Sequence, residues 1–427
     1  MSWVERDAAV VWHGFTQMAC YADNHPVIVE RAEGRELIDV DGRRYLDAIS
    51  SLWVNTLGHR VPELDEALHQ QIDRVAHTTM LGNGNRVVVE FAEALAAVVP
   101  VDDPHVLFAS DGASAVEQAL KIAFQYWTNR GVEGRHSYLA FGDGYHGDTV
   151  GALSLGASGF GTHIFDPLRF PVRRAPSFAD DPSLETAIAL VQAHGDELAA
   201  VVVEPLIQAA GGMQLARPDA FAPLAAVCAR TGVLLICDEV ATGFGRTGTL
   251  FACEAIGVRP DLLCLGKGIT GGYLPMSATV AAARVFDAFS GADLSEATLY
   301  HGHSYGGNAL AAAVALRHLQ LMHEWDVLAN VRARSAQLRD VLSHRVGCRA
   351  AVADIRVCGL MAGVQISAAS GGARLARQIC AAMVQRGVLS RSLGDIITLV
   401  PPLTTTAPEI DRIVDALAGA LDDLGAT

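Results

Sequence analysis

The sequence predicts an α/β fold, with a large domain around a mostly parallel β-sheet and a smaller α+β domain built from both ends of the chain. Two observations support this prediction. Short apolar runs alternate with helical patterns from about residue 105 to 282, as in sheets whose parallel strands are joined by helices. The flanking regions instead show strand-like runs close together with glycine-containing turns, which is typical of antiparallel pairs.

Six apolar runs mark the expected strands of the large domain: "VLFAS" (106–110), "SYLAF" (137–141), "AAVVVEP" (199–205), "VLLICDEV" (233–240), "LLCLG" (262–266) and "SATVAA" (277–282). Helical patterns such as "GASAVEQALKIAFQYW" and "DAFAPLAAVCARTG" lie between several of them. In a sheet of this kind the ligand binds beyond the carboxyl ends of the strands. We therefore look for a site where these runs end.

The flanks predict the smaller domain. "PVIVERAEGRELIDVDG" indicates a small antiparallel piece within residues 27–50, and "RVCGLMAGVQI" and "DIITLVPP" lie between helical patterns near the other end of the chain. A long helix pattern, "NALAAAVALRHLQLMHEW", precedes that C-terminal part. We expect residues 60–325 to form the large domain, and residues 1–59 and 326–427 to form the small one.

Composition favours a globular protein that handles small molecules. The chain has 427 residues, of which 51% are hydrophobic and 19% charged, so it can bury a large core. A net charge of -15 without a basic block argues against nucleic-acid or anionic-membrane binding. "MSWVERDAAVVWHGF" lacks the order of a signal peptide, and no apolar run is long enough for a membrane span. We expect a cytoplasmic protein, whose eight scattered cysteines are reduced thiols.

Lysine is rare in this chain, which draws attention to one position. Of the 32 Lys and Arg residues, 2 are lysines, Lys121 and Lys267, and the other 30 are arginines. Lys267 lies between an apolar run and a glycine cluster in "DLLCLGKGITGGYLP". A desolvated lysine can become a neutral amine that acts as a nucleophile or base, whereas arginine stays protonated. Amine chemistry at Lys267 competes here with simple arginine bias in the composition.

Other polar residues follow the strand runs. Asp238 ends the apolar run of "LLICDEVATG", where a buried acid needs a cationic or hydrogen-bonding partner. In "ASDGASAVEQALK" a strand runs through small residues into a helix start, whose free N–H groups suit a phosphate. The simpler alternatives are that Asp238 caps a loop or pairs with an arginine, and that the Asp or Ser before the helix is an ordinary N-cap.

Two further motifs contain aromatic or histidine side chains that could bind a ligand. "GDGYHGDT" places Tyr145 and His146 in a glycine-flanked loop after a strand, where an aromatic ring could lie on a planar ligand or close the top of the core. His301 and His303 in "YHGHSYGGN" resemble a metal pair, but no further ligands cluster nearby in the sequence, so we expect no metal site.

One cofactor uses all of these parts. Pyridoxal phosphate needs a lysine that holds it as an imine, a carboxylate that keeps its pyridine nitrogen protonated and an anion site for its phosphate. Arginine cannot form the imine, which would explain a lysine at position 267. The sequence thus predicts pyridoxal phosphate as the cofactor.

The motifs "CDEVATGFGRTG" and "PDLLCLGKGITGGYLP" resemble the class III, or omega-type, aminotransferases of pyridoxal-phosphate fold type I, in which a seven-stranded sheet forms the large domain. Asp238 and Lys267 are 29 residues apart, as in that family. The resemblance covers nearly the whole chain. It implies that Lys267 forms the imine and moves protons, and that Asp238 holds the pyridine nitrogen.

The same resemblance implies further cofactor contacts and a partner. By this resemblance Gly112 and Ala113 bind the phosphate of the cofactor, and Ser304 reaches the phosphate in a neighbouring subunit. The resemblance also implies that the ring of Tyr145 stacks on the cofactor, and that the other neighbours of the cofactor are His146, Glu204 and Val240. We therefore expect a homodimer with shared active sites that acts on a small-molecule amino donor and keto acceptor.

Within this family the chain resembles most the branch that aminates 8-amino-7-oxononanoate in biotin biosynthesis, on the motifs "WHGFTQM", "DAISSLWVNTLGHR", "HTTMLG" and "VLSRSLGDIITLVPPLTTT". That branch implies that Phe15, Trp53 and Tyr145 line the substrate site and that Arg391 binds the far carboxylate, a suitable task for a guanidinium. Gly14 and Ser392 stand where the branch usually has proline. Another amino ketone, a diamine or an amino acid such as lysine stays open as the substrate, and the amino donor stays open between S-adenosylmethionine and lysine.

Overall fold

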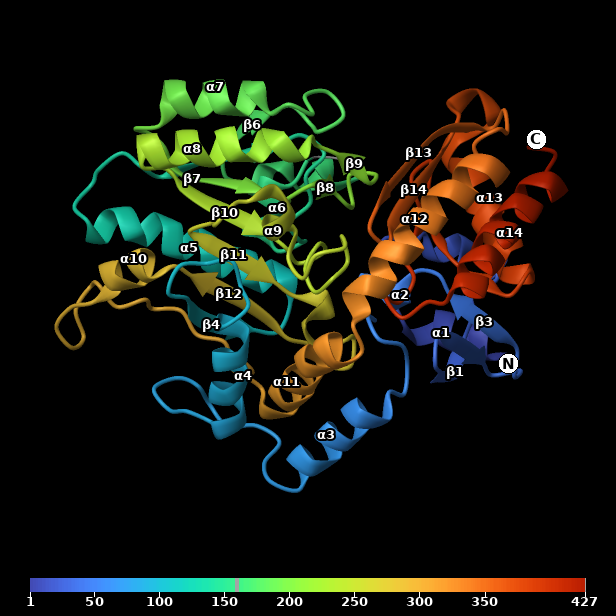
Figure 1. Ribbon diagram of the computed structural model, residues 1–427, viewed down its shortest axis with the longest axis horizontal. Coiled ribbons are helices and arrows are strands. Elements are labelled where there is room, and N and C mark those ends of the chain that lie inside the picture. Colours follow the sequence, from blue (N-terminus) through green and yellow to red (C-terminus); the bar gives the residue numbers. More distant parts are fainter. Residues whose placement is uncertain (158–160, 427) are drawn as a thin grey trace.

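The computed structural model describes residues 1–157 and 161–426. A seven-stranded sheet forms the centre of the larger part of the molecule (Figure 1). In spatial order its strands are β4 (His105–Ala109), β12 (Ser277–Ala281), β11 (Leu262–Leu265), β10 (Leu234–Asp238), β7 (Leu198–Val203), β5 (Ser137–Phe141) and β6 (Arg173–Ala175). Only β12 runs antiparallel to its neighbours. The prediction of a mostly parallel sheet is confirmed.

The six predicted runs are strands of this sheet, with ends shifted by two residues or fewer. The seventh strand, β6, gave no apolar signal because its sequence is Arg173-Arg174-Ala175 at the sheet edge.

Helices cover both faces of the sheet, which explains why its strands read as continuous apolar runs. One set of strand residues, including Val201 and Leu235, packs into a core cluster with α4 (Arg86–Ala96), α7 (Glu185–His194) and α8 (Phe221–Thr231). The alternate residues Val202 and Ile236 pack with α5 (Gly112–Asn129) and α6 (Val150–Leu155). The helices of this part are α3 (Pro62–Ile72), α4 (Arg86–Ala96), α5 (Gly112–Asn129), α6 (Val150–Leu155), α7 (Glu185–His194), α8 (Phe221–Thr231), α9 (Ala252–Ile256), α10 (Ala283–Phe286) and α11 (Ala309–Glu324).

The chain ends build the smaller part. Its two four-stranded sheets are β1 (Val29–Glu33), β2 (Glu36–Asp39), β3 (Arg44–Asp47) and β15 (Val388–Leu389), and β13 (Val352–Cys358), β14 (Met361–Ile366), β17 (Ile396–Leu399) and β16 (Arg391–Leu393). The helices α12 (Val327–Arg345) and α13 (Gly372–Gln385) pack on the second sheet, and α14 (Ala407–Asp423) packs against these two helices. Strand β15 pairs with β3, so both chain ends share one sheet. The exact boundaries at residues 60 and 325 stay a prediction.

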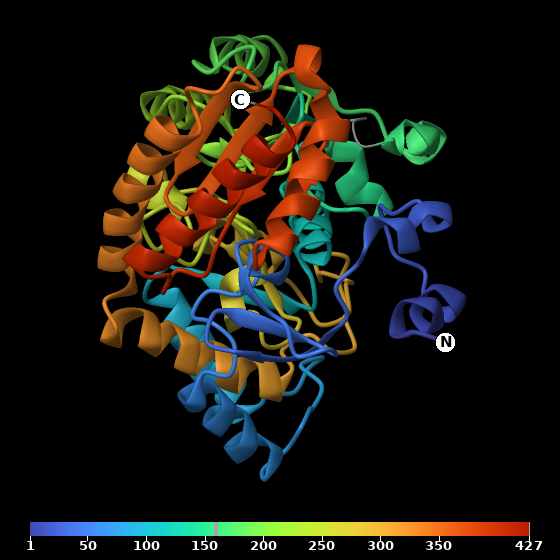
Figure 2. The same cartoon turned by 90° about the vertical axis from the view of Figure 1, so that its right-hand side faces the viewer.

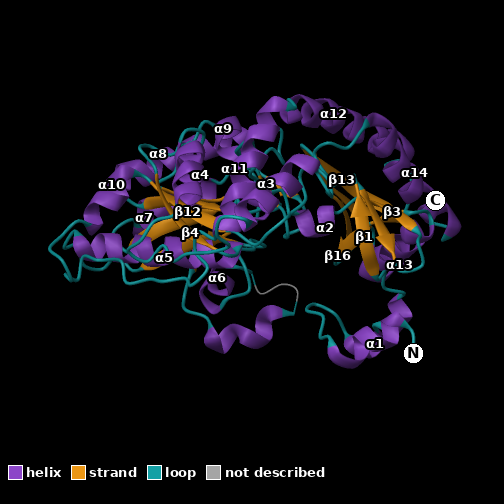
Figure 3. Ribbon diagram, turned by 90° about the horizontal axis from the view of Figure 1, so that it is seen from below, coloured by secondary structure: helices purple, strands orange, loops and turns teal. Residues whose placement is uncertain are grey.

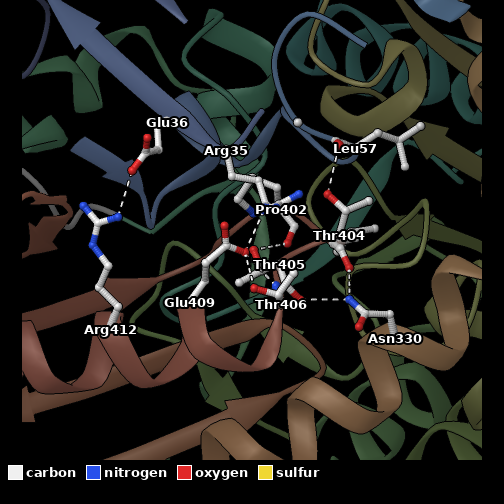
Figure 4. A network of polar contacts seen from close by, with 12 residues as sticks. Arg35, Glu36, Leu57, Asn330, Pro402, Thr404, Thr405, Thr406, Glu409 and Arg412 are labelled. Atoms are coloured by element: carbon white, nitrogen blue, oxygen red, sulfur yellow. Dashed lines mark hydrogen bonds and ion pairs between the residues drawn. The ribbon is translucent and has the colours of Figure 1, made fainter. Parts of the chain in front are cut away.

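Polar contacts also join the two chain ends (Figure 4). Arg35 donates to Glu409 of α14 at 2.7 Å, and Arg412 donates to Glu36 at 2.8 Å. The hydroxyl of Thr404 donates to the carbonyl of Leu57 at 2.9 Å. Helix α14 and the segment before it therefore hold residues on both sides of β3.

The first residues, with helix α1 (Trp3–Val10), lie apart from the sheets (Figures 2 and 3). Helix α1 buries none of its residues, and Trp12 and Phe15 beyond it are 88% and 64% exposed. A short α2 (Ser50–Trp53) and a β8–β9 hairpin (Ile207–Gln208, Gln214–Leu215) complete the elements near the site. Among the described residues, no helix has both the length and the apolar character to cross a bilayer.

Candidate active site

Lys267 lies just beyond strand β11 and is the first residue of a short 3-10 helix, η5 (Lys267–Thr270). Its φ of 41° is in the left-handed region, which a side chain other than glycine adopts only when its surroundings hold it there. The amine lies over the ring of Trp53, 5.4 Å from the ring centre. Burial lowers the pKa of Lys267, while the charges of Asp238 and Glu204 oppose that shift. Lys267 therefore carries the desolvated amine that the sequence predicted.

Asp238 is the last residue of the neighbouring strand β10 and is buried. Its Oδ2 lies 2.7 Å from Nδ1 of the buried His146, and its Oδ1 accepts the backbone N–H of Val240 at 3.0 Å. Burial alone would lower the pKa of His146, but the hydrogen bond to Asp238 and the charge of Asp238 raise it above its ordinary value. The pair thus gives the buried Asp238 carboxylate a hydrogen-bonding partner inside the protein.

Glu204 follows strand β7 and is a second buried acid near Lys267. Desolvation raises its pKa to about 7, against the opposing effect of His146. Its two oxygens accept the backbone N–H groups of Tyr145 at 3.2 Å and Ala209 at 3.1 Å. Glu204 thus connects the Tyr145 loop to the β8–β9 hairpin.

The start of helix α5 is the predicted phosphate site. The carboxylate of Asp111 accepts the N–H of Ser114 at 2.9 Å. The N–H groups of Gly112 and Ala113 have no hydrogen-bond partner within residues 1–157 and 161–426. A Cβ on Gly112 would lie 2.5 Å from the side chain of Val240, so only glycine lets the loop after β10 approach this helix end. The sheet thus brings Val240 to the predicted phosphate site.

Tyr145 is half-buried in the loop after β5, and its hydroxyl donates to Asp148 at 2.8 Å. Burial, then the hydrogen bond to Asp148, raises the pKa of Tyr145, which stays a neutral phenol. Sequence reasoning missed Asp148, although the acid stands three residues after Tyr145 in the same glycine loop.

Trp53 is a predicted substrate-site aromatic that the structure brings next to Lys267. It is 6% exposed, and its indole nitrogen has no hydrogen-bond partner within the described chain. Ser50, Ser51 and Trp53 all have positive φ angles. The indole packs in a buried apolar cluster with Ile207 and with Met361 of β14, and the amine of Lys267 lies over its ring.

Three further predicted site residues are exposed. Phe15 is exposed on the N-terminal segment, and Ser304 is exposed in a turn where its carbonyl accepts from His77 at 2.7 Å. Arg391 is exposed on β16, and it forms no ion pair with any described residue. Their roles stay predictions.

The cluster fits pyridoxal phosphate. A lysine with a lowered pKa, a buried carboxylate on the adjacent strand and a helix start with free N–H groups lie beyond the carboxyl ends of β11, β10 and β4. Within the described residues no three His, Cys, Asp or Glu side chains are grouped as metal ligands, and His301 instead lies 3.2 Å from the amine of Lys121. The site thus offers the amine of Lys267 beside the carboxyl groups of Asp238 and Glu204.

The family model described as "Aminotransferase class-III" matches residues 18–421. The chain belongs to the class III aminotransferases. It is 43% identical to the adenosylmethionine-8-amino-7-oxononanoate aminotransferase of Nitratidesulfovibrio vulgaris, over 97% of this chain and 80% of that protein. The enzyme of that name from Aquifex aeolicus is 39% identical, over 98% and 96% of the two chains.

Solved structures agree with this assignment. The crystal structure of adenosylmethionine-8-amino-7-oxononanoate aminotransferase from Methanocaldococcus jannaschii matches with a TM-score of 0.93 and 36% identity, over 98% of each chain. An amine transaminase from an uncultivated Pseudomonas species, in its pyridoxal-phosphate-bound form, matches with a TM-score of 0.91 and 32% identity, over 97% and 99%. Fold type I, aminotransferase activity on small molecules and pyridoxal phosphate as cofactor are thereby confirmed.

Proposed function

We propose that this aminotransferase converts 8-amino-7-oxononanoate to 7,8-diaminononanoate in biotin biosynthesis, in the cytoplasm. The observation that carries the proposal is the 36–43% identity, over nearly the whole chain, to the relatives from three organisms that are named for this substrate. Arg391 adds a residue-level argument. An exposed guanidinium without an acidic partner among the described residues is free to bind the far carboxylate of the substrate.

The site residues take distinct roles in this proposal. When bound, pyridoxal phosphate supplies a ring that accepts the electron pair left when the amino donor loses a proton. Lys267 has a pKa lowered by burial, so its amine is available to hold the cofactor and to carry that proton. Asp238, backed by His146, would keep a proton on the ring nitrogen. The N–H groups of Gly112 and Ala113 would hold the phosphate.

A second copy of the chain completes the site in this proposal. Phe15, Trp12 and Tyr305 are large apolar side chains that are more than half exposed, which is costly in water and typical of surfaces that pack on a partner. Ser304 lies next to Tyr305 in the same exposed turn. We infer a homodimer in which Ser304 reaches the phosphate of the partner's site, and in which the N-terminal segment covers a substrate site.

The test is a half-reaction. Purified holoenzyme is mixed with 7,8-diaminononanoate without acceptor, and the visible absorbance of the lysine-bound cofactor is followed. Rapid bleaching at low diamine concentration is expected, because the diamine is the product of the proposed reaction. The variant Lys267→Ala should bind the cofactor without that absorbance and lose turnover by several orders of magnitude. A near-normal rate in this variant would contradict the role of Lys267.

A second candidate is a class III omega-transaminase for another amino ketone, diamine or amino acid. The amine transaminase at TM-score 0.91 favours it, as do Gly14 and Ser392 beside the proposed substrate contacts. In this case the holoenzyme bleaches with other amines but not with 7,8-diaminononanoate. The same assay with S-adenosylmethionine and with lysine identifies the donor.

A further inference from the structure

A buried histidine lies beneath the turn that carries Lys267. His318 is fully buried on helix α11, which packs against η5. A Cβ on Gly271, which ends η5 with a φ of 65°, would lie 3.1 Å from the ring carbon Cδ2 of His318. The imidazole therefore touches the backbone of the lysine turn itself.

The polar atoms of this ring face two different segments. Nε2 lies 2.6 Å from the hydroxyl oxygen of Thr56. Nδ1 has no partner of standard hydrogen-bond geometry in the described chain, yet the backbone of Ile269, inside η5, raises the pKa of the ring. Burial has the larger effect and lowers that pKa to about 4, so the imidazole is neutral at ordinary pH. A neutral ring that accepts from Thr56 at Nε2 carries its N–H at Nδ1, on the side of the Ile269 carbonyl.

Thr56 extends the contact to the C-terminal part of the chain. Its methyl group lies 3.1 Å from the Cβ position of Gly268, the residue after Lys267. Its carbonyl accepts the N–H of Leu403 at 2.6 Å, next to the contacts of Leu57 and Thr404 drawn in Figure 4. A continuous set of contacts thus runs from Leu403 through Thr56 to Gly268, the residue that follows Lys267.

Simple core packing does not account for this arrangement. Leucine or methionine would fill the same volume without burying a ring nitrogen that lacks a full hydrogen bond, which costs about 1–3 kcal/mol. The histidine also lies where the chain needs support, because Lys267 has a left-handed φ of 41° that surrounding contacts must hold.

We propose that His318 is a positioning residue for Lys267: with Thr56 it holds the η5 turn so that the amine stays over Trp53 and near Asp238. Neither residue touches the reacting atoms. The inference rests on the assignment of Lys267 as the cofactor-binding lysine, and it adds a device that connects that lysine to the smaller part of the protein.

Four variants separate positioning from packing. His318→Met replaces the imidazole with an apolar side chain of similar length, and Thr56→Val replaces the hydroxyl with a methyl group. His318→Gln is the conservative variant, because its amide still reaches Thr56. His323→Gln is the control, since His323 is exposed on the same helix.

The first readout needs no cofactor. The apoenzyme is treated with acetic anhydride over a pH series, and labelling is measured by mass spectrometry. Since the chain has 2 lysines, the exposed Lys121 serves as internal reference. We expect His318→Met and Thr56→Val to move the half-labelling of Lys267 to higher pH, because a looser turn admits water and restores the ordinary pKa of the amine. His318→Gln and His323→Gln should follow the parent protein.

The second readout is steady-state kinetics of the holoenzymes. We expect His318→Met and Thr56→Val to lower kcat about tenfold with KM changed less than about twofold. A misplaced amine of Lys267 slows the proton transfer without weakening substrate binding. His318→Gln should recover most of the loss. Unchanged labelling and unchanged kcat per bound cofactor, even with a lower melting temperature, would overturn the positioning role. Attachment of the cofactor to Lys121 after borohydride reduction would instead refute the assignment of Lys267.

Discussion

Nδ1 of His146 lies 2.7 Å from Oδ2 of Asp238, and both side chains are buried although 92 residues separate them along the chain. Asp238 ends β10, whereas His146 belongs to the loop after β5, two strands away across β7. The sheet therefore supplies the partner that a buried acid at a strand end requires. The other charged groups that act on this histidine are Glu204, which raises its pKa, and Arg174, which lowers it.

This pair predicts a pH-dependent contribution to the stability of the apoenzyme. The pKa of His146 is raised in the folded state, so its contribution is fully present below its unfolded pKa of about 6.5 and is lost as the pH rises through the folded value. The variant His146→Gln can still donate a hydrogen bond to Asp238 but cannot carry a charge. We expect it to be less stable than the parent by about 1.5–3 kcal/mol at low pH, the usual net contribution of a hydrogen bond to a charged group.

The measurement is urea unfolding of the two apoenzymes between about pH 5.5 and 8.5. The difference in unfolding free energy should shrink as the pH rises, because the parent histidine then becomes neutral. A difference that stays constant or grows with pH would show that His146 is neutral throughout and that burial outweighs Asp238. His323→Gln, which changes an exposed histidine, controls for the general effect of losing a titratable ring.

The start of α5 gives a second prediction, which concerns the phosphate site. Gly112→Ala would place a methyl group 2.5 Å from Val240, so the helix start or the loop after β10 must move. Such overpacking costs about 1–3 kcal/mol. We expect a weaker affinity for pyridoxal phosphate, measured by equilibrium dialysis of the holoenzyme. The unfolding free energy of the apoenzyme should fall by less than the binding free energy of the cofactor does.

Two matched variants test the cause. Adding Val240→Ala to Gly112→Ala removes the atoms that the new methyl group meets, so the double variant should bind the cofactor more tightly than Gly112→Ala alone. Gly84→Ala is the control, because no atom lies within 4 Å of the added Cβ. Equal affinity in Gly112→Ala and the parent would mean that the phosphate does not depend on the close approach of Val240.

Sequence reasoning found the parts of the site that lie at strand ends, because apolar runs and the polar residues after them are local features. Lys267 and Asp238 follow β11 and β10 as expected. The pairing of His146 with Asp238 and of His318 with Thr56 depends on which strands and helices become neighbours, which no local pattern states. Strand β6 was missed for a related reason: its edge position, not its composition, makes it a strand.

Arg391 gives the last prediction, on substrate recognition. Its exposed guanidinium on β16 has no acidic partner among the described residues, so a carboxylate substrate would meet a free cation there. Arg391→Gln should raise KM for 8-amino-7-oxononanoate by about 10- to 100-fold, the effect of losing 1.5–3 kcal/mol of charge-assisted hydrogen bonding. The half-reaction of a short amine without a carboxylate should keep its rate, because Lys267 and Asp238 are untouched. Arg377→Gln, at an exposed arginine of α13, is the control. An equal loss with both substrates would place Arg391 outside substrate recognition and favour a role in folding of the β16 edge.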